Sequence, residues 1–213
     1  MPRVDGPREP ITDTILKPWQ FPAYELRLDL SRVDLSRLAS SGARSTDKGI
    51  QISTLSREVE RDPASVERVY ALHSDCHRHQ PPVALRQSPI PFHLWSWASL
   101  EAKDEALPGA YFIAVDRGRY VGLSTVARVR RLPGVLECRF TGVLPENRGR
   151  GIGMALKVEV VRFGIENGYR ELRATVLAEN AAMLRINEAL GFQRYRSFVL
   201  GYPQLMTPEP RRV

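Results

Sequence analysis

Cysteine is scarce in this chain, and it has no long apolar run. Cys76 and Cys138 are the only two cysteines among 213 residues, which excludes a framework of disulfides. No apolar run approaches the ~20 residues that span a bilayer, and no basic segment followed by an apolar stretch opens the sequence. We therefore expect a soluble, cytoplasmic protein that has no membrane partner.

Acidic residues are fewer than basic ones: the chain has 24 Asp and Glu and 31 Lys and Arg, which gives a net charge of +7. Such basicity is compatible with nucleic-acid binding. However, the arginines are scattered and interleaved with Asp and Glu, and Arg130-Arg131 and Arg211-Arg212 are the only doublets. Nucleic acid is therefore a poor candidate partner, and a ligand that carries several phosphates is a better one.

The most informative stretch, residues 141–154, reads Thr-Gly-Val-Leu-Pro-Glu-Asn-Arg-Gly-Arg-Gly-Ile-Gly-Met. An apolar strand precedes it and an amphipathic helix follows at once. Glycines in such a turn leave backbone N–H groups accessible, and these groups bind phosphate together with the helix dipole. A Walker loop does not fit because no Lys-Ser or Lys-Thr pair follows, and a Rossmann fingerprint does not fit because Met154 replaces its last glycine.

A second motif follows one strand later, where Asn180 opens a segment that ends in Leu190-Gly191-Phe192. Its apolar residues recur at helical spacing, and Gly191 is placed to end the helix. The order of Arg-x-x-Gly-x-Gly at 148–153 and then Asn…Leu-Gly-Phe resembles the GNAT superfamily of acyl-CoA-dependent N-acyltransferases. The resemblance covers approximately residues 49–200.

Hydrophobic periodicity predicts the remaining elements. Strands are expected over 50–55, 110–116, 120–129, 136–143, 171–177 and 192–202. Helices are expected over 62–77, 91–106, from 152 to a turn at Gly168, and over 180–190. This order resembles the GNAT fold. It implies an α/β (α+β) architecture in which a central, mixed, mostly antiparallel twisted sheet has splayed fourth and fifth strands and helices on both faces.

The N-terminal part departs from the family pattern. Residues 1–48 are expected to form an extension with a proline-rich arm, a half-solvated strand over 23–30, a short helical turn over 35–41 and a linker. Residues 49–205 would form the GNAT domain, and 206–213 a tail. Only one strand follows Leu-Gly-Phe where GNAT domains usually have two, so strand 23–30 is expected to complete the sheet edge. The chain thus resembles the second half of a tandem GNAT protein.

The resemblance implies acetyl-CoA as co-substrate and no metal. GNAT enzymes pair the pantetheine arm with a splayed strand, here 140–144 with a bulge expected at Gly142, and they bind the pyrophosphate on the loop at 148–153. The residues assigned to the coenzyme in this way are Thr141, Gly142, Val143, Arg148, Gly149, Arg150, Gly151, Ile152, Gly153, Met154, Asn180 and Met183.

Acyl transfer also needs a base for the amine, and an acid can assist the departing thiolate. Glu137, on the splayed strand, is the candidate base, and a solvated charge at the strand edge is the alternative. Many GNAT enzymes carry an acidic Tyr seven residues after the Asn that opens the last helix. Here that position is Asn187, which can only hydrogen-bond the sulfur. Tyr195 is therefore a second candidate acid, and direct departure of the thiolate is the third option.

Histidines and tryptophans gather between residues 73 and 97. His73, Cys76 and His77 have helical spacing that could suit a metal, but a fourth ligand is missing, so no metal is expected. In GNAT folds the first two helices border the acceptor site. The candidate acceptor residues are therefore His77, His79, His93, Trp95 and Trp97, although core packing is the more ordinary role for at least one tryptophan.

The sequence thus predicts an N-acyltransferase that moves an acetyl group from acetyl-CoA directly to a primary amine within a ternary complex. The amine belongs to a small molecule or a peptide. No covalent acyl-enzyme is expected, because Cys138 should face away from Glu137. The alternative is a non-catalytic acyl-CoA sensor or partner-binding domain, which Asn187 favours. A nucleic-acid binder is a third hypothesis, and a homodimer is left open.

Overall fold

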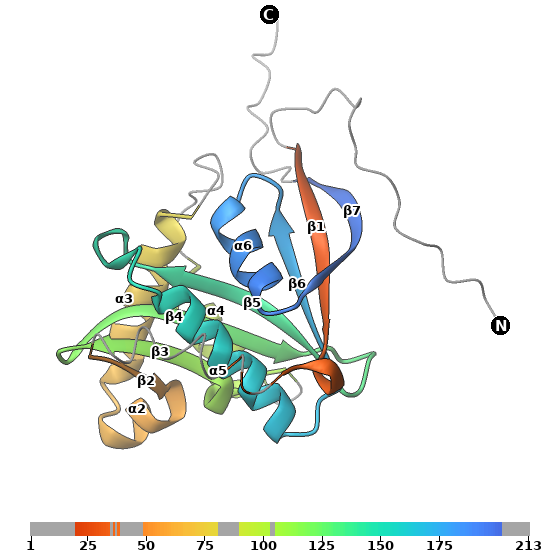
Figure 1. Ribbon diagram of the computed structural model, residues 1–213. Coiled ribbons are helices and arrows are strands. Elements are labelled where there is room, and N and C mark those ends of the chain that lie inside the picture. Colours follow the sequence, from red (N-terminus) through yellow and green to blue (C-terminus); the bar gives the residue numbers. More distant parts are fainter. Residues whose placement is uncertain are drawn as a thin grey trace, which may run out of the picture.

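A seven-stranded sheet forms the centre of the computed structural model, with strand order β2-β3-β4-β5-β6-β1-β7 (Figure 1). The structure describes residues 20–34, 36, 38, 49–80, 90–102 and 105–201. Neighbouring strands are antiparallel except β5 and β6, which are parallel. The strands are β1 (Gln20–Asp29), β2 (Ile50–Thr54), β3 (Tyr111–Asp116), β4 (Arg119–Arg128), β5 (Val135–Val143), β6 (Glu171–Leu177) and β7 (Gln193–Gly201).

Helices cover both faces of this sheet, as expected. Helix α5 packs its apolar side in one buried cluster with β1, β3, β5 and β6, while α3 and α4 contribute to a second cluster on the opposite face. The mixed, mostly antiparallel α/β prediction is therefore confirmed. The helices are α2 (Leu55–Arg61), α3 (Ser65–Arg78), α4 (Phe92–Ser96), a π-helical turn (Trp97–Glu101), α5 (Ile152–Glu166) and α6 (Ala181–Ala189).

The hairpin between β3 and β4 follows the sequence prediction. Arg117 and Gly118 form its turn with φ angles of 49° and 77°. Two consecutive positive φ values match the right-handed twist of the flanking strands, so this turn type favours the tight two-residue connection. The predicted helical turn over 35–41, the linker up to residue 48 and the C-terminal tail lie mostly outside the described residues.

The N-terminal strand lies inside the sheet, where an edge position was expected. β1 pairs antiparallel with β6 on one side and with β7 on the other, and β7 forms the edge. Its charged side is also less solvated than expected, because Glu25 is only 7% exposed and bonds to Arg27 and Arg196. Two arginines therefore neutralise a carboxylate that alternation alone would have placed in water.

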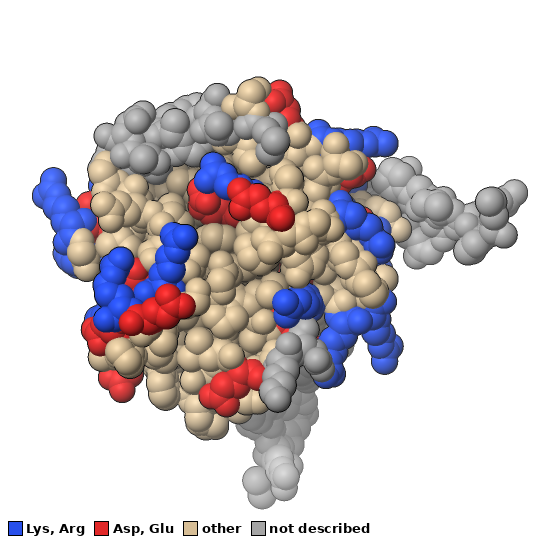
Figure 2. All heavy atoms as spheres, turned by 90° about the horizontal axis from the view of Figure 1, so that it is seen from below, with Lys and Arg blue, Asp and Glu red and all other residues tan. Residues whose placement is uncertain are grey.

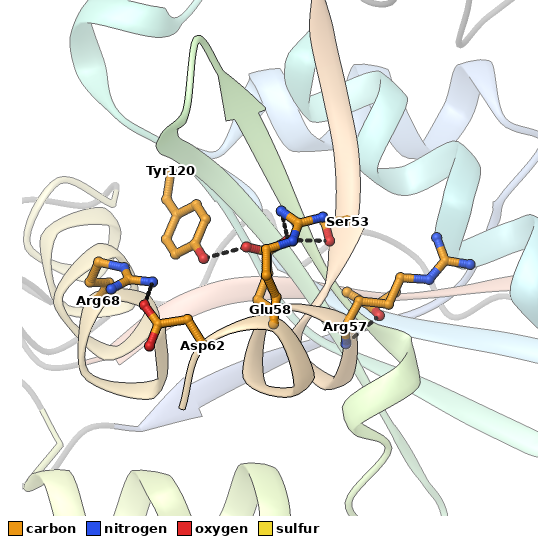
Figure 3. Close-up of polar contacts among 8 residues, drawn as sticks. Ser53, Arg57, Glu58, Asp62, Arg68 and Tyr120 are labelled. Atoms are coloured by element: carbon orange, nitrogen blue, oxygen red, sulfur yellow. Dashed lines mark hydrogen bonds and ion pairs between the residues drawn. The ribbon is translucent and has the colours of Figure 1, made fainter. Parts of the chain in front are cut away.

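Helix α2 is an element that the sequence prediction missed. Thr54 caps it by accepting a hydrogen bond from the N–H of Arg57. Glu58 anchors it to the sheet, since Ser53 and the Tyr120 hydroxyl each donate to this buried carboxylate at 2.5 Å (Figure 3). Burial alone would raise the pKa of Glu58, but these hydrogen bonds and nearby arginines outweigh burial and lower it.

The bulge in β5 lies earlier than expected. The register of β4 and β5 shifts between Thr125/Phe140 and Val126/Cys138, which leaves Arg139 as the extra residue and corrects the expectation at Gly142. Gly142 has a different role, because a Cβ atom there would lie 2.6 Å from the Cβ atom of Cys76 on α3. Glycine thus allows α3 to pack closely on the strand.

The interior position of β1 can be tested through its contribution to stability. Leu26 is fully buried in the core between β6 and β7. We expect Leu26→Ala to lower the free energy of unfolding by about 2–5 kcal/mol, because it leaves a cavity in the sheet core. Urea denaturation followed by circular dichroism measures this change. Leu94→Ala, at a residue that is 50% exposed, is the control and should change stability by less than about 0.5 kcal/mol. Equal losses in the two variants would contradict the placement of β1.

Candidate active site

Strands β5 and β6 separate partway along their length. Their parallel pairing runs from Val135/Glu171 to Cys138/Ala174 and stops there, although β5 continues to Val143. A cavity of about 850 Å³ lies at this divergence. Its size suits a small-molecule ligand, and the unpaired strand edge beside it presents backbone groups that can pair with an extended chain.

The glycine-rich loop borders the same cavity. Gly149 and Gly151 have φ angles of 74° and 83°, which side chains strongly disfavour. Gly151 is the N-cap of α5, and no side chain caps this helix. The N–H groups of the first turn therefore have no intrahelical acceptor, and the positive end of the helix dipole faces outward. This arrangement suits an anion such as a diphosphate.

The two loop arginines differ in placement. Arg148 lines the cavity, where its guanidinium donates to the carbonyls of Val143 at 3.1 Å and His79 at 2.9 Å. Arg150 instead donates to the carboxylate of Asp116 at 2.6 Å, and its residue does not line the cavity. The family resemblance assigned both arginines to the coenzyme, whereas the structure brings only Arg148 to the cavity.

The cavity brings together all the other residues that the resemblance assigned to the coenzyme. Asn180 caps α6 through a 3.2 Å hydrogen bond from the N–H of Met183, as its position predicted. The predicted residues that line the cavity are Thr141, Gly142, Val143, Arg148, Gly149, Gly151, Ile152, Gly153, Met154, Asn180 and Met183.

The three candidate catalytic residues lie in different places. Asn187 lines the cavity and is fully buried. Glu137 lies on β5 outside the cavity lining and forms an ion pair with Arg139 at 3.2 Å. Tyr195 lies on the edge strand β7, where Arg27 stacks on its ring, and it does not line the cavity. The structure therefore does not bring Tyr195 to the cavity.

Asn187 has one unused polar atom. Its side-chain N–H donates to the carbonyl of Met183 at 2.9 Å, but its buried Oδ1 atom has no hydrogen-bond partner among the described residues. Buried acceptors are almost always paired. A ligand that donates a hydrogen bond in the cavity would satisfy this atom.

Sequence reasoning missed Lys157 as a cavity residue. This lysine of α5 is only 1% exposed, and its Nζ atom donates to the Sγ atom of Cys138 at 3.1 Å. It also lies 4.8 Å from the ring centroid of Phe192. Its helical spacing of four residues from Gly153 was the available signal, because that spacing places it on the face of α5 that continues from the glycine loop.

An aromatic cluster covers the opposite side of β5. His77 stacks on Phe140 with ring centroids 5.6 Å apart, and His73 lies 5.1 Å from the same ring. Trp95 is 3% exposed and packs in the core, so core packing holds for this tryptophan. The other acceptor candidates, His79, His93 and Trp97, are exposed.

Glu137 points to the same side of β5 as this aromatic cluster, because its neighbours Leu136 and Cys138 pack towards α5 on the other side.

Burial changes the ionisation of two groups in this region. It lowers the pKa of His73 to about 4, with a smaller contribution from the nearby His77. Burial also raises the pKa of the Cys76 thiol to about 12, so this cysteine stays protonated at neutral pH. Within the described ranges, no group of His, Cys, Asp and Glu side chains could hold a metal ion.

Comparison with known proteins identifies the family. The model of the acetyltransferase (GNAT) family matches residues 66–192, so this chain belongs to the GNAT family of acetyltransferases. A curated relative, mycothiol acetyltransferase from Amycolatopsis mediterranei, is 32% identical over 95 residues. That alignment covers 42% of this chain and 32% of the relative, so the matched region spans about a third of the relative's length.

Solved structures share the fold at low sequence identity. A GCN5-related N-acetyltransferase from Sphaerobacter thermophilus has a TM-score of 0.59 at 20% identity, over 86% of this chain and 51% of that chain. A tandem GNAT protein from the clavulanic acid biosynthesis pathway has a TM-score of 0.54 at 19% identity, over 85% of this chain and 53% of that chain. The predicted resemblance to half of a tandem GNAT protein is therefore supported by fold.

On the face shown in Figure 2, basic and acidic side chains lie beside one another around a broad uncharged area. Duplex binding would need a continuous basic patch, and the coloured residues of this face do not form one. In the described part of the chain, none of the helices combines the length and the apolar character that a membrane span requires.

Gly151 allows a direct test of the loop. A β-branched residue at this positive φ would strain the turn and crowd the amides, so Gly151→Val should weaken binding of coenzyme A at least about tenfold. Isothermal calorimetry measures the affinity. Gly168→Val, at φ 71° beyond the other end of α5, is the matched control and should leave affinity unchanged. Unchanged affinity in Gly151→Val would exclude the loop from the coenzyme site.

The lowered pKa of the buried His73 should make the stability of the protein depend on pH. Its pKa is near 4 when folded and ~6.5 when unfolded, so between these values the unfolded chain binds the extra proton. Stability should therefore decrease as pH falls through this window. The free energy of unfolding should thus be lower at pH 4.5 than at pH 7, and His73→Phe should reduce this difference by about 2–3 kcal/mol. Urea unfolding at the two pH values tests this, and an unchanged difference would refute it.

Proposed function

We propose that this GNAT enzyme transfers an acetyl group from acetyl-CoA directly to a primary amine in a ternary complex. The observation that carries the proposal is the cavity between β5 and β6, which runs from the uncapped N-terminus of α5 to Cys138 and Ala174. A diphosphate suits one end and an extended pantetheine arm suits the unpaired edge of β5. The acyl group then lies near the point where the strands part.

Direct transfer is favoured over a covalent acyl-enzyme. Cys76 is buried and stays protonated, so it is a poor nucleophile. Cys138 packs towards α5, on the opposite face of the strand from Glu137 and the aromatic cluster. Glu137, the candidate base, is therefore not placed to deprotonate Cys138 for attack on the thioester. Holding both substrates in one complex supplies the catalytic advantage of proximity.

Glu137 is our candidate for the group that accepts the proton of the amine. It lies on β5 at the border between the splayed edge and the aromatic side, one residue from the last pair before the strands part. The acceptor would approach along Phe140 and His77, two half-buried side chains whose rings stack on each other. An amine with an apolar or aromatic body suits this surface.

An acyl-CoA-binding sensor without turnover is the second candidate. It is favoured by Asn187, which replaces the acidic tyrosine found in many GNAT enzymes and which cannot donate a proton as an acid. Incubation with acetyl-CoA and a panel of primary amines separates the two functions. Release of free thiol that depends on the amine supports the transferase, whereas tight acetyl-CoA binding without thiol release supports the sensor.

Glu137→Gln tests the assigned base. We expect kcat to fall by about 10²–10⁴-fold while the affinity for acetyl-CoA is unchanged, because the amide cannot accept the amine proton. The residual rate should rise with pH, since a greater fraction of the amine is then already deprotonated. Glu159→Gln, on α5 where Glu159 pairs with Arg162, is the matched control and should keep full activity. Full activity of Glu137→Gln would remove Glu137 from the mechanism.

A further inference from the structure

A buried ammonium group lies at the inner end of the cavity. Lys157 is 1% exposed, and its Nζ atom donates to Sγ of Cys138, the last β5 residue that pairs with β6. Both residues line the cavity. Lys157 therefore places a cation at the point where the two strands separate.

This cation has no carboxylate partner among the described residues. Its contacts there are the sulfur of Cys138 and the ring of Phe192. Burying a charge without a counter-ion is costly, and lysines are rarely fully buried unless they are paired. The natural explanation is that the missing anion arrives with a ligand of the cavity.

A second polar atom of the cavity also lacks a partner among the described residues. The Oδ1 atom of Asn187, a fully buried residue that lines the same cavity, accepts no hydrogen bond from them. A ligand that presents a hydrogen-bond donor would satisfy this atom, and an amide N–H of the pantetheine arm is such a donor. The buried cation calls for a ligand with negative charge, and the buried acceptor calls for a ligand with a hydrogen-bond donor. A single ligand of the cavity could carry both groups.

The geometry of β5 indicates which ligand atom reaches Lys157. Residues 139–143 of this strand run from the inner end of the cavity towards the glycine loop, and five extended residues span roughly 17 Å at ~3.4 Å per residue. If the diphosphate lies on the loop, as the proposed function holds, the extended arm places its sulfur near Cys138. The sulfur is the atom that becomes negative when the acyl group leaves.

We propose that Lys157 is a catalytic residue that stabilises the departing coenzyme A thiolate, in place of the acidic tyrosine that the family often uses. This inference rests on the proposed function. The amine nitrogen forms a bond to the acyl carbon, the carbon–sulfur bond breaks, and its electron pair stays on sulfur. The ammonium of Lys157 keeps its protons and pairs with this thiolate, while the amine proton passes to Glu137 or water.

A thiolate-stabilising role of Lys157 explains how acyl transfer can proceed although Asn187 occupies the position of the acidic tyrosine found in many GNAT enzymes. A thiol ionises with a pKa of ~8.5, so a thiolate can leave without being protonated if a positive charge is already in place. A fixed charge in a site that excludes water stabilises such a developing anion more than bulk solvent does. Asn187 then acts as a positioning residue for the arm.

The first test uses the leaving group. In single-turnover reactions, Lys157→Met should slow acetyl transfer from acetyl-CoA by about 10²-fold. With acetyl-seleno-CoA, which releases a more stable selenolate through the same contacts, the loss should be less than about tenfold. Lys157→Arg keeps the charge and should restore part of the rate. Equal losses with both donors would refute a role in leaving-group stabilisation, because a structural defect would slow both reactions alike.

The second test needs no turnover. Calorimetry compares coenzyme A with desulfo-coenzyme A, which lacks only the sulfur. The wild-type protein should prefer coenzyme A by about tenfold at pH 8.5, as expected for a charge-assisted contact, and the preference should shrink as the pH is lowered and the thiol stays protonated. Lys157→Met should lose this preference while keeping its affinity for desulfo-coenzyme A.

Two further variants serve as controls in the calorimetric comparison of coenzyme A with desulfo-coenzyme A. Arg162→Met removes one positive charge from the same helix at a surface ion pair with Glu159, and it should keep the preference for coenzyme A. Lys157→Gln is a second variant in case the Met substitution impairs folding, and it should lose the preference in the same way. Retention of the preference in both Lys157 variants, or its absence in the wild-type protein, would overturn the proposal.

The outcomes separate this inference from the proposed function. A wild-type protein that prefers coenzyme A over desulfo-coenzyme A but acetylates no amine would refute the transferase and retain the contact between Lys157 and sulfur. A wild-type protein that acetylates amines but shows neither the preference nor the leaving-group effect would retain the transferase and refute the role of Lys157.

Discussion

The interruption of the hydrogen bonds between β5 and β6 is the constraint on which the site depends. A parallel pair normally continues as long as both strands do, yet here it ends at Cys138 and Ala174 while both strands run on. The bulge at Arg139 turns β5 at this point. Backbone groups that would otherwise complete the sheet are thereby left to a ligand, and the cavity lies between them.

The two faces of β5 separate two kinds of chemistry. On the side of α5, the uncapped helix start, Arg148, Lys157 and Asn187 form a lining suited to a diphosphate, an amide arm and a departing sulfur. On the other side, Phe140 and the histidines of α3 form an aromatic surface near Glu137. In the function that we propose, this strand holds the thioester while the amine approaches along the aromatic surface.

The sequence predicted the parts of the fold that depend on local signals. The hairpin at Arg117-Gly118 and the cap at Asn180 follow from turn and capping preferences, and the structure confirms both. Features that depend on distant partners could not be read in this way. The interior position of β1 and the burial of Glu25 require arginines and strands from other parts of the chain. Lys157 was missed because its role depends on where β5 and β6 part.

The most direct test of the account is a crystal structure of the protein with bound coenzyme A. We expect the diphosphate oxygens to accept hydrogen bonds from the amides of residues 149–153, and the pantetheine arm to lie along residues 139–143. We also expect the sulfur to lie next to Lys157. A coenzyme bound elsewhere, or β5 and β6 closed against each other beyond Cys138, would contradict the account.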